Sequence, residues 1–74
     1  MSQREQNMRQ TVLAAGYTVE KISGNSVWFL DSARRLHRAD FSNNGRSVIW
    51  VYPYADLSVP QVHGAGRLYR NARV

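Results

Sequence analysis

The segment "SNNGRSVIWVYPY", residues 42–54, decides the predicted fold class of this 74-residue chain. It opens with "SNNG", residues 42–45, a strong β-hairpin signal because Asn and Gly accept the backbone angles of tight turns. The β-branched and aromatic residues that follow predict a strand over residues 46–53. Pro53 ends this strand or marks a sheet edge, because proline has no N–H to donate to the neighbouring strand.

The same hairpin signal decides the segment before it, since a hairpin needs a strand on each side. Residues 34–41 are ambiguous by themselves, because Asp31 or Ser32 could cap a short helix there. The alternative is a third strand whose one face carries Arg35, His37, Ala39 and Phe41. We predict the strand.

The N-terminal residues 2–15 are predicted to form a helix. Ser2 and Glu5 have the S-x-x-E spacing of a capping box. Apolar residues then recur at helical intervals, and Gly16 is well placed to end the helix in a left-handed conformation.

Residues 17–31 are predicted to form a β-hairpin. The segments "YTVEKIS" and "SVWFLD" are rich in β-branched and aromatic residues. Between them, Gly24 and Asn25 form a two-residue turn of the type that places Gly first.

Together these elements predict an α+β fold. An N-terminal helix packs on a three- to four-stranded antiparallel β-meander over residues 17–53, and a loosely ordered basic C-terminal segment follows over residues 54–74. At this length we expect one small domain, residues 1–74.

The sheet poses a problem, because a lone helix covers only one of its faces. If one face packs on the helix with Val27, Phe29, Ile49 and Val51, the opposite face carries Trp28, Leu30, Val48, Trp50 and Tyr52. Both sets are apolar. The assignment could be reversed, but in either case one apolar set has no partner in the helix and needs something to cover it.

Three explanations for the second face stay open. The C-terminal segment could fold back over it with Val59, Val62, Leu68 or Tyr69. A second copy of the chain could pair with it, because exposed apolar patches often mark interfaces. Alternatively, the aromatic residues could stack on the bases of single-stranded nucleic acid.

The charge of the chain points to an anionic partner. The net charge is +5, and nine of the ten basic residues are Arg. Arginine suits bidentate contacts with phosphates and stacking on bases, and a basic surface attracts nucleic acid or an acidic protein. No long basic amphipathic helix is evident, so we expect no membrane partner.

The cluster "RRLHR", residues 34–38, is the densest positive charge and the main candidate binding site. For contacts to nucleic acid or an acidic partner, the candidate residues are Arg34, Arg35, His37, Arg38, Arg46, Arg67 and Arg70. For stacking or an interface, they are Trp28, Trp50 and Tyr52.

Catalysis and metal binding have little support in the sequence. The five carboxylates show no pairing typical of acid–base catalysis, there is no cysteine, and the two histidines have no metal-ligand spacing. "GAG", residues 64–66, follows no predicted strand and lacks the lysine of a phosphate-binding loop. We therefore expect no enzyme, cofactor or metal, and an RNA-acting enzyme using His37 is a remote third hypothesis.

The segment "VLAAGYTVEKISGNSVWFL", residues 12–30, resembles the start of HicA-type toxins, which are small RNA-cleaving proteins with a double-stranded-RNA-binding-like fold. The resemblance covers about residues 8–30. The family has a catalytic histidine just after the glycine of this hairpin, and this chain has Asn25, Ser26 and Val27 there. The resemblance therefore implies a small nucleic-acid-associated fold and gives no reason to infer RNA cleavage.

From these features we expect a small basic, non-enzymatic nucleic-acid-binding module for DNA or RNA. The alternative is a phage- or plasmid-type inhibitor or adaptor that docks an acidic surface of a host protein, with a homodimer as one form. The first ten residues are polar and unlike a signal peptide, and no apolar run approaches the roughly 18 residues of a membrane span. The expected location is the cytoplasm.

Overall fold

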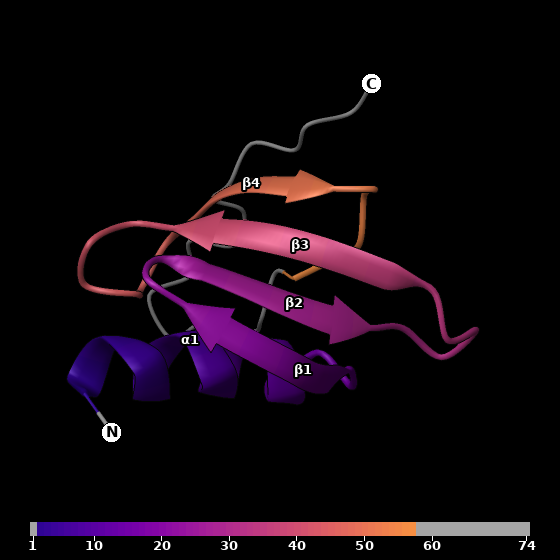
Figure 1. Ribbon diagram of the computed structural model, residues 1–74, viewed down its shortest axis with the longest axis horizontal. Coiled ribbons are helices and arrows are strands. Elements are labelled where there is room, and N and C mark those ends of the chain that lie inside the picture. The colour runs from indigo at the N-terminus through magenta and orange to yellow at the C-terminus, as the bar shows by residue number, and fades with distance from the viewer. Residues whose placement is uncertain (1, 58–74) are drawn as a thin grey trace.

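The computed structural model describes residues 2–57, and the expectations for residues 58–74 lie outside the described part (Figure 1). The elements are α1 (Gln3–Ala14), β1 (Thr18–Ser23), β2 (Ser26–Leu30), β3 (Leu36–Phe41) and β4 (Val48–Tyr52). The four strands form one antiparallel sheet in the order β1-β2-β3-β4, and α1 lies on one face of it. The predicted α+β meander is confirmed.

The helix begins and ends through the residues that its sequence predicts. Ser2 and Glu5 form the capping box, in which the Glu5 N–H donates to Ser2 Oγ at 3.1 Å and the Ser2 N–H donates to the Glu5 carboxylate at 3.2 Å. Gly16 has a φ of 91°, and its N–H donates to the Leu13 carbonyl. A left-handed residue here ends the helix and turns the chain into β1.

The two hairpin turns also form where the sequence predicts them. Gly24 has a φ of 59°, and Ser23 pairs with Ser26 across the turn. The second turn is closed by the Gly45 N–H, which donates to the Ser42 carbonyl at 2.8 Å. Gly45 has a φ of 75°, and a Cβ added there would lie 2.5 Å from the Arg4 carbonyl oxygen, so this turn packs directly on the first turn of α1.

Residues 36–41 form a strand, as the hairpin argument predicts. His37, Ala39 and Phe41 are buried on the side of the sheet that carries the core, so the alternation expected of a half-buried strand is present. Arg35, which was predicted to share that face, precedes the strand and is exposed.

The prediction for β4 is wrong at two residues. Asp40 pairs with Trp50 but Phe41 pairs with Val48, so Ile49 is an extra residue in a β-bulge. Val48 and Val51 are therefore both buried, whereas Ile49 is 54% exposed. Strict alternation had assigned Ile49 to the helix side and Val48 to the opposite face.

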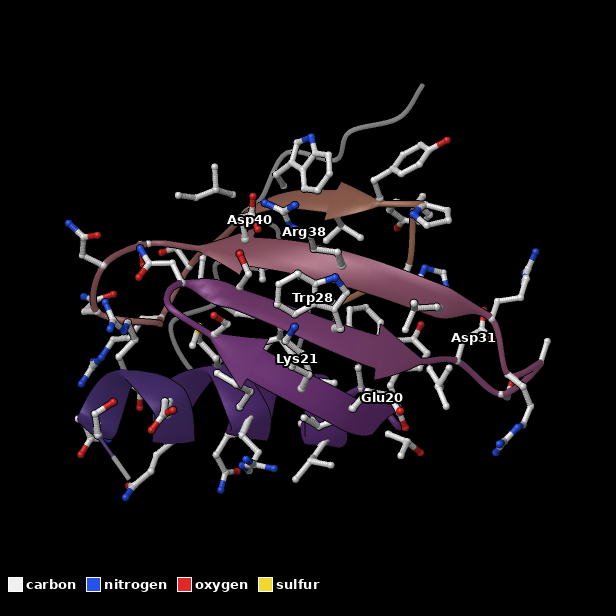
Figure 2. All side chains as sticks on the ribbon, viewed as in Figure 1. Glu20, Lys21, Trp28, Asp31, Arg38 and Asp40 are labelled. Atoms are coloured by element: carbon white, nitrogen blue, oxygen red, sulfur yellow. The ribbon has the colours of Figure 1, made fainter. Side chains whose placement is uncertain are left out.

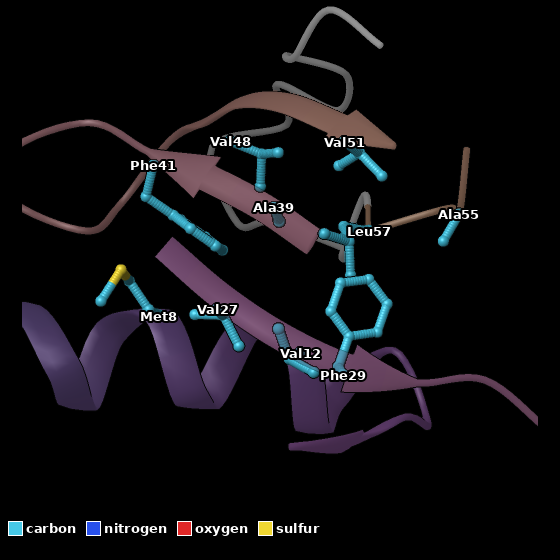
Figure 3. Packing of buried hydrophobic residues seen from close by; sticks show 10 residues of the cluster. All are labelled: Met8, Val12, Val27, Phe29, Ala39, Phe41, Val48, Val51, Ala55 and Leu57. Atoms are coloured by element: carbon cyan, nitrogen blue, oxygen red, sulfur yellow. The ribbon is translucent and has the colours of Figure 1, made fainter. Parts of the chain in front are cut away.

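The core lies between the sheet and α1 (Figure 3). Its buried apolar residues are Met8, Val12, Val27, Phe29, Ala39, Phe41, Val48, Val51, Ala55 and Leu57. The last two follow β4, so the chain beyond Pro53 returns to the helix side of the sheet (Figure 3). The first covering option, with Val59, Val62, Leu68 or Tyr69, lies outside the described residues.

Asn25 joins the two turns to the helix at one end of the sheet. Its side-chain oxygen accepts from Arg4 Nη1 at 2.7 Å, and its side-chain nitrogen donates to Asn43 Oδ1 at 3.0 Å. Nearby, Asn7 donates to the Asn44 carbonyl at 2.8 Å. These contacts fix the position of α1 against the strands without adding apolar area.

Candidate functional site

The face of the sheet opposite α1, called here the open face, carries a straight row of cationic and aromatic side chains. Lys21 pairs with Trp28, Trp28 with Arg38, and Arg38 with Tyr52, so one residue comes from each of the four strands. Figure 2 shows the first three of these residues on β1, β2 and β3. Trp50 lies in the adjacent row, opposite Asp40. Neighbouring strands are about 4.8 Å apart, so the row spans about 14 Å.

The side chains of this row contact one another. The Lys21 ammonium lies 4.8 Å from the centre of the Trp28 ring. The Arg38 guanidinium carbon lies 5.5 Å from the Trp28 ring and 5.4 Å from the Trp50 ring. The Trp50 and Tyr52 ring centres are 6.1 Å apart. These cation–π and ring contacts join the four paired residues and Trp50 into one surface. This surface is called here the cation–aromatic row and consists of Lys21, Trp28, Arg38, Trp50 and Tyr52.

Asp40 fixes the orientation of Arg38. Arg38 Nε donates to Asp40 Oδ1 at 3.0 Å, Arg38 Nη2 donates to Oδ2 at 3.1 Å, and the Ser26 hydroxyl donates to Oδ1 at 2.6 Å. Burial raises the pKa of Asp40, but the hydrogen bonds from Arg38 and Ser26 outweigh burial and lower that pKa overall. The hydrogen bonds to Asp40 likewise raise the pKa of Arg38. The guanidinium is therefore charged and held in one plane.

The rings of the row are accessible from solvent. Trp28 and Trp50 are half-buried, and Tyr52 is 46% exposed. Of the two face assignments that the sequence left open, the structure has the one with Trp28, Leu30, Trp50 and Tyr52 opposite the helix. Val48 is the exception already described. Leu36, 54% exposed, adds apolar surface at one end of this face.

A shallow hollow of about 320 Å³ opens beside the row, over β1 and β2. It is lined by Glu20, Lys21, Trp28 and Leu36. Glu20 sits at a second β-bulge, because Val19 pairs with Phe29 and the next paired residue of β1 is Lys21. The hollow therefore combines an aromatic ring, an aliphatic side chain, a cation and a carboxylate.

The structure divides the "RRLHR" cluster among three places. Arg34 and Arg35 lie in the loop between β2 and β3, Arg38 lies on the open face, and His37 is buried in the core. Alternation along β3 separates neighbours in this way, because successive side chains of a strand point to opposite faces. The sequence spacing alone had suggested a single contiguous cluster.

The assignment of His37 to the binding surface is wrong, because its side chain is 3% exposed. Nδ1 donates to the Pro53 carbonyl oxygen at 2.7 Å, Nε2 is hydrogen-bonded to Asp31 Oδ2 at 2.7 Å, and the ring stacks on Phe29 with centres 5.1 Å apart. A carbonyl oxygen can only accept, so Nδ1 carries a proton. His37 thus ties the β2–β3 loop to the chain that leaves β4.

Asp31 organises the loop that presents Arg34 and Arg35. Its Oδ1 accepts from the backbone N–H groups of Ala33 and Arg35 at 2.8 and 2.9 Å, and Arg35 Nε lies 3.4 Å from Oδ2. The hydrogen bond with His37, followed by that from the Arg35 N–H, lowers the pKa of Asp31 to about 2. Arg34 has a φ of 64°, which is rare for a residue with a side chain.

Arg46, another of the predicted basic residues, does not join the row. Arg46 is exposed in the β3–β4 turn, at the opposite end of β3 from Arg34 and Arg35. Arg67 and Arg70 lie outside the described residues. Within residues 2–57, the cations that contact the rings of the open face are Arg38 and Lys21, and Lys21 was not among the residues predicted from the sequence.

The sequence did not predict three of the residues at this site, which are Lys21, Glu20 and Asp40. Lys21 could have been found, because counting back from a two-residue turn at Gly24 and Asn25 places it opposite Trp28. Asp40 lies two residues beyond Arg38 on the same strand face, which was also visible. The position of Glu20 depends on the bulge, for which the sequence carries no signal.

Among residues 2–57, no three His, Asp or Glu side chains gather closely enough to hold a metal ion. The described helix, at 12 residues, is neither long nor apolar enough to cross a membrane.

Comparison with known proteins adds no assignment to this geometry. No protein-family model, curated protein or solved structure matches the chain. The resemblance of residues 8–30 to HicA-type toxins thus remains a prediction from the sequence.

Proposed function

We propose that this protein is a non-enzymatic nucleic-acid-binding module that binds its ligand across the open face of the sheet. The single observation behind the proposal is the cation–aromatic row, in which Lys21, Trp28, Arg38 and Tyr52 align across four strands. Sheets that bind single strands stack bases on aromatic side chains and contact phosphates with nearby cations. The row offers both types of group within one surface.

Each member of the row has a role in this proposal. Tyr52 is the most exposed ring of the row and stacks on one base, while the half-buried Trp50 beside it stacks on a second base. Arg38, oriented by Asp40, presents its remaining N–H groups to a phosphate. Lys21 contacts a phosphate from the other side of Trp28.

The loop between β2 and β3 extends the positive surface at one end of the row. Arg34 and Arg35 are exposed there, and the Asp31 hydrogen bonds hold the backbone that carries them. A held loop presents its charges with a smaller loss of conformational entropy on binding than a mobile loop would. This loop lies at the same end of β3 as the Arg38–Tyr52 pair, so a bound nucleic-acid strand can contact Tyr52 and the loop arginines together.

The test is the affinity of the purified protein for random-sequence single-stranded and double-stranded oligonucleotides at two salt concentrations. We expect binding at low salt that weakens as salt rises, because released counterions drive phosphate contacts. Tyr52→Ala should weaken binding, while Ile49→Ala, an exposed apolar residue of the same strand outside the row, should not. Absence of binding to any oligonucleotide at low salt would eliminate this function.

The alternative is a protein-interaction role, in which the open face docks an acidic protein surface or a second copy of the chain. The observation in its favour is exposed apolar surface at Leu36 and Tyr52 next to Arg38, since aromatic residues and Arg are enriched in interfaces. The molar mass of the protein in solution shows whether two copies of the chain associate. A dimer that dissociates in Tyr52→Arg, with no oligonucleotide binding, would favour the alternative.

A further inference from the structure

The hollow beside the cation–aromatic row contains a carboxylate that the fold does not use. Glu5 caps α1, Asp31 holds the β2–β3 loop, and Asp40 holds Arg38. The Glu20 side chain, in contrast, is exposed and makes no hydrogen bond or ion pair with another residue in the part of the chain that the structure describes.

The bulge in β1 places Glu20 beside Lys21 and Trp28. Bulges re-aim side chains, and here two consecutive residues of one strand line the same hollow, which an unbroken strand would place on opposite faces. The volume of about 320 Å³ lies at the lower end of the range for small-molecule sites, about 300–1,000 Å³. A single planar base suits this size better than a larger ligand.

A free carboxylate works against a surface that binds phosphates, because like charges repel. Glu20 lowers the general affinity of the open face for a polyanion, so its place in the hollow calls for a compensating contact. A nucleic acid offers one: carboxylates accept hydrogen bonds from the exocyclic amino group of cytosine, whereas thymine and uracil place an acceptor oxygen at the same position.

We infer that the hollow takes one base of a bound single strand and selects an amino-bearing base, cytosine among the pyrimidines, through Glu20. Trp28 and Leu36 supply the apolar contacts with the ring. Lys21, a flexible donor beside Trp28, reaches the base carbonyl oxygen or the adjoining phosphate. This inference rests on the proposed function and narrows it to single-stranded ligands, because a base can enter the hollow only when it is unpaired and unstacked.

The experiment compares oligo(dC) with oligo(dT) of equal length at neutral pH and fixed salt. These ligands match in backbone charge and in ring size, so a difference between them reports the base edge. We expect the wild type to bind oligo(dC) about five- to tenfold more tightly than oligo(dT). This preference lies at the lower end of the discrimination that a good contact to a base edge gives, because the hollow is open to water.

Glu20→Ala should remove this preference chiefly by strengthening binding to oligo(dT), because the repulsive charge is lost. Binding to oligo(dC) should change less, because it also loses the carboxylate that accepts its hydrogen bond. Ser23→Ala, an exposed polar residue of the same strand outside the hollow, should keep the wild-type preference. Circular dichroism of both variants checks that the fold is retained.

The outcomes separate the two proposals. Equal affinity of the wild type for the two oligonucleotides, or an unchanged preference in Glu20→Ala, overturns the selection by Glu20 while leaving the proposed function standing. Binding to neither oligonucleotide at low salt overturns both proposals.

Discussion

Asp31 Oδ2 and His37 Nε2 lie 2.7 Å apart at the end of the sheet where β2 passes into β3. Through this bond and the one from His37 Nδ1 to the Pro53 carbonyl, a buried imidazole links the loop that carries Arg34 and Arg35 to the exit of β4. One buried ring thereby positions two surface elements that flank Tyr52.

Stability should fall in acid because of Asp31. Its pKa is lowered from 3.8 to about 2, chiefly by the hydrogen bond with His37, so the folded state favours the charged form. This contribution is fully present above pH 3.8 and is lost as the pH falls towards 2. The free energy of unfolding, measured with urea at several pH values, should therefore fall across this window by more in the wild type than in Asp31→Asn.

Glu20→Gln is the matched control for that measurement, because Glu20 is an exposed carboxylate that makes no hydrogen bond or ion pair within residues 2–57. It should retain the acid dependence of the wild type. The same acid dependence in Asp31→Asn as in the wild type would contradict the role of Asp31.

Gly45→Ala should destabilise the protein more than Gly24→Ala. Both glycines have a positive φ, which costs a residue with a side chain about 1–2 kcal/mol. At Gly45 a new Cβ would also lie 2.5 Å from the Arg4 carbonyl oxygen, while at Gly24 no atom lies within 4 Å. Thermal or urea unfolding of the two variants gives the difference, and equal losses would show that the turn does not pack on α1 this closely.

Arg38 should account for part of the salt dependence of nucleic-acid binding. Arg38→Ala removes one phosphate contact, so the slope of log affinity against log salt should become shallower by about 0.7 for a single strand. Arg38→Lys should keep the slope but lose affinity, because lysine cannot reproduce the two hydrogen bonds to Asp40 or the planar contact with the Trp28 and Trp50 rings. If the slope of log affinity against log salt is unchanged in Arg38→Ala, then Arg38 does not contact a phosphate.

Tyr52→Ala should weaken binding of single strands by about 1–3 kcal/mol, the range found when a stacking aromatic residue is removed. Tyr52→Phe retains the ring and should bind like the wild type, because stacking needs the ring and not the hydroxyl. Titration with a labelled oligonucleotide measures both variants. A loss of affinity in Tyr52→Phe as large as in Tyr52→Ala would argue against stacking.

The sequence by itself determined the elements whose signals are local. The capping box of Ser2 and Glu5, the Gly24–Asn25 turn and the "SNNG" turn involve residues within a few positions of one another, so the short-range sterics and hydrogen bonds that create them can be read from the chain. The order of one helix followed by a three- to four-stranded antiparallel meander follows from these signals.

Only the tertiary structure decided how the strands align and which charged groups meet. The bulges at Glu20 and Ile49 shift the register, and no short-range pattern marks them because they arise from the fit of each edge strand to its neighbour and to the core. His37 lies in a basic run yet is buried, because the partners that satisfy its ring, Asp31 and Pro53, are 6 and 16 residues away. The joining of Arg38 to rings from two other strands depends in the same way on contacts between distant parts of the chain.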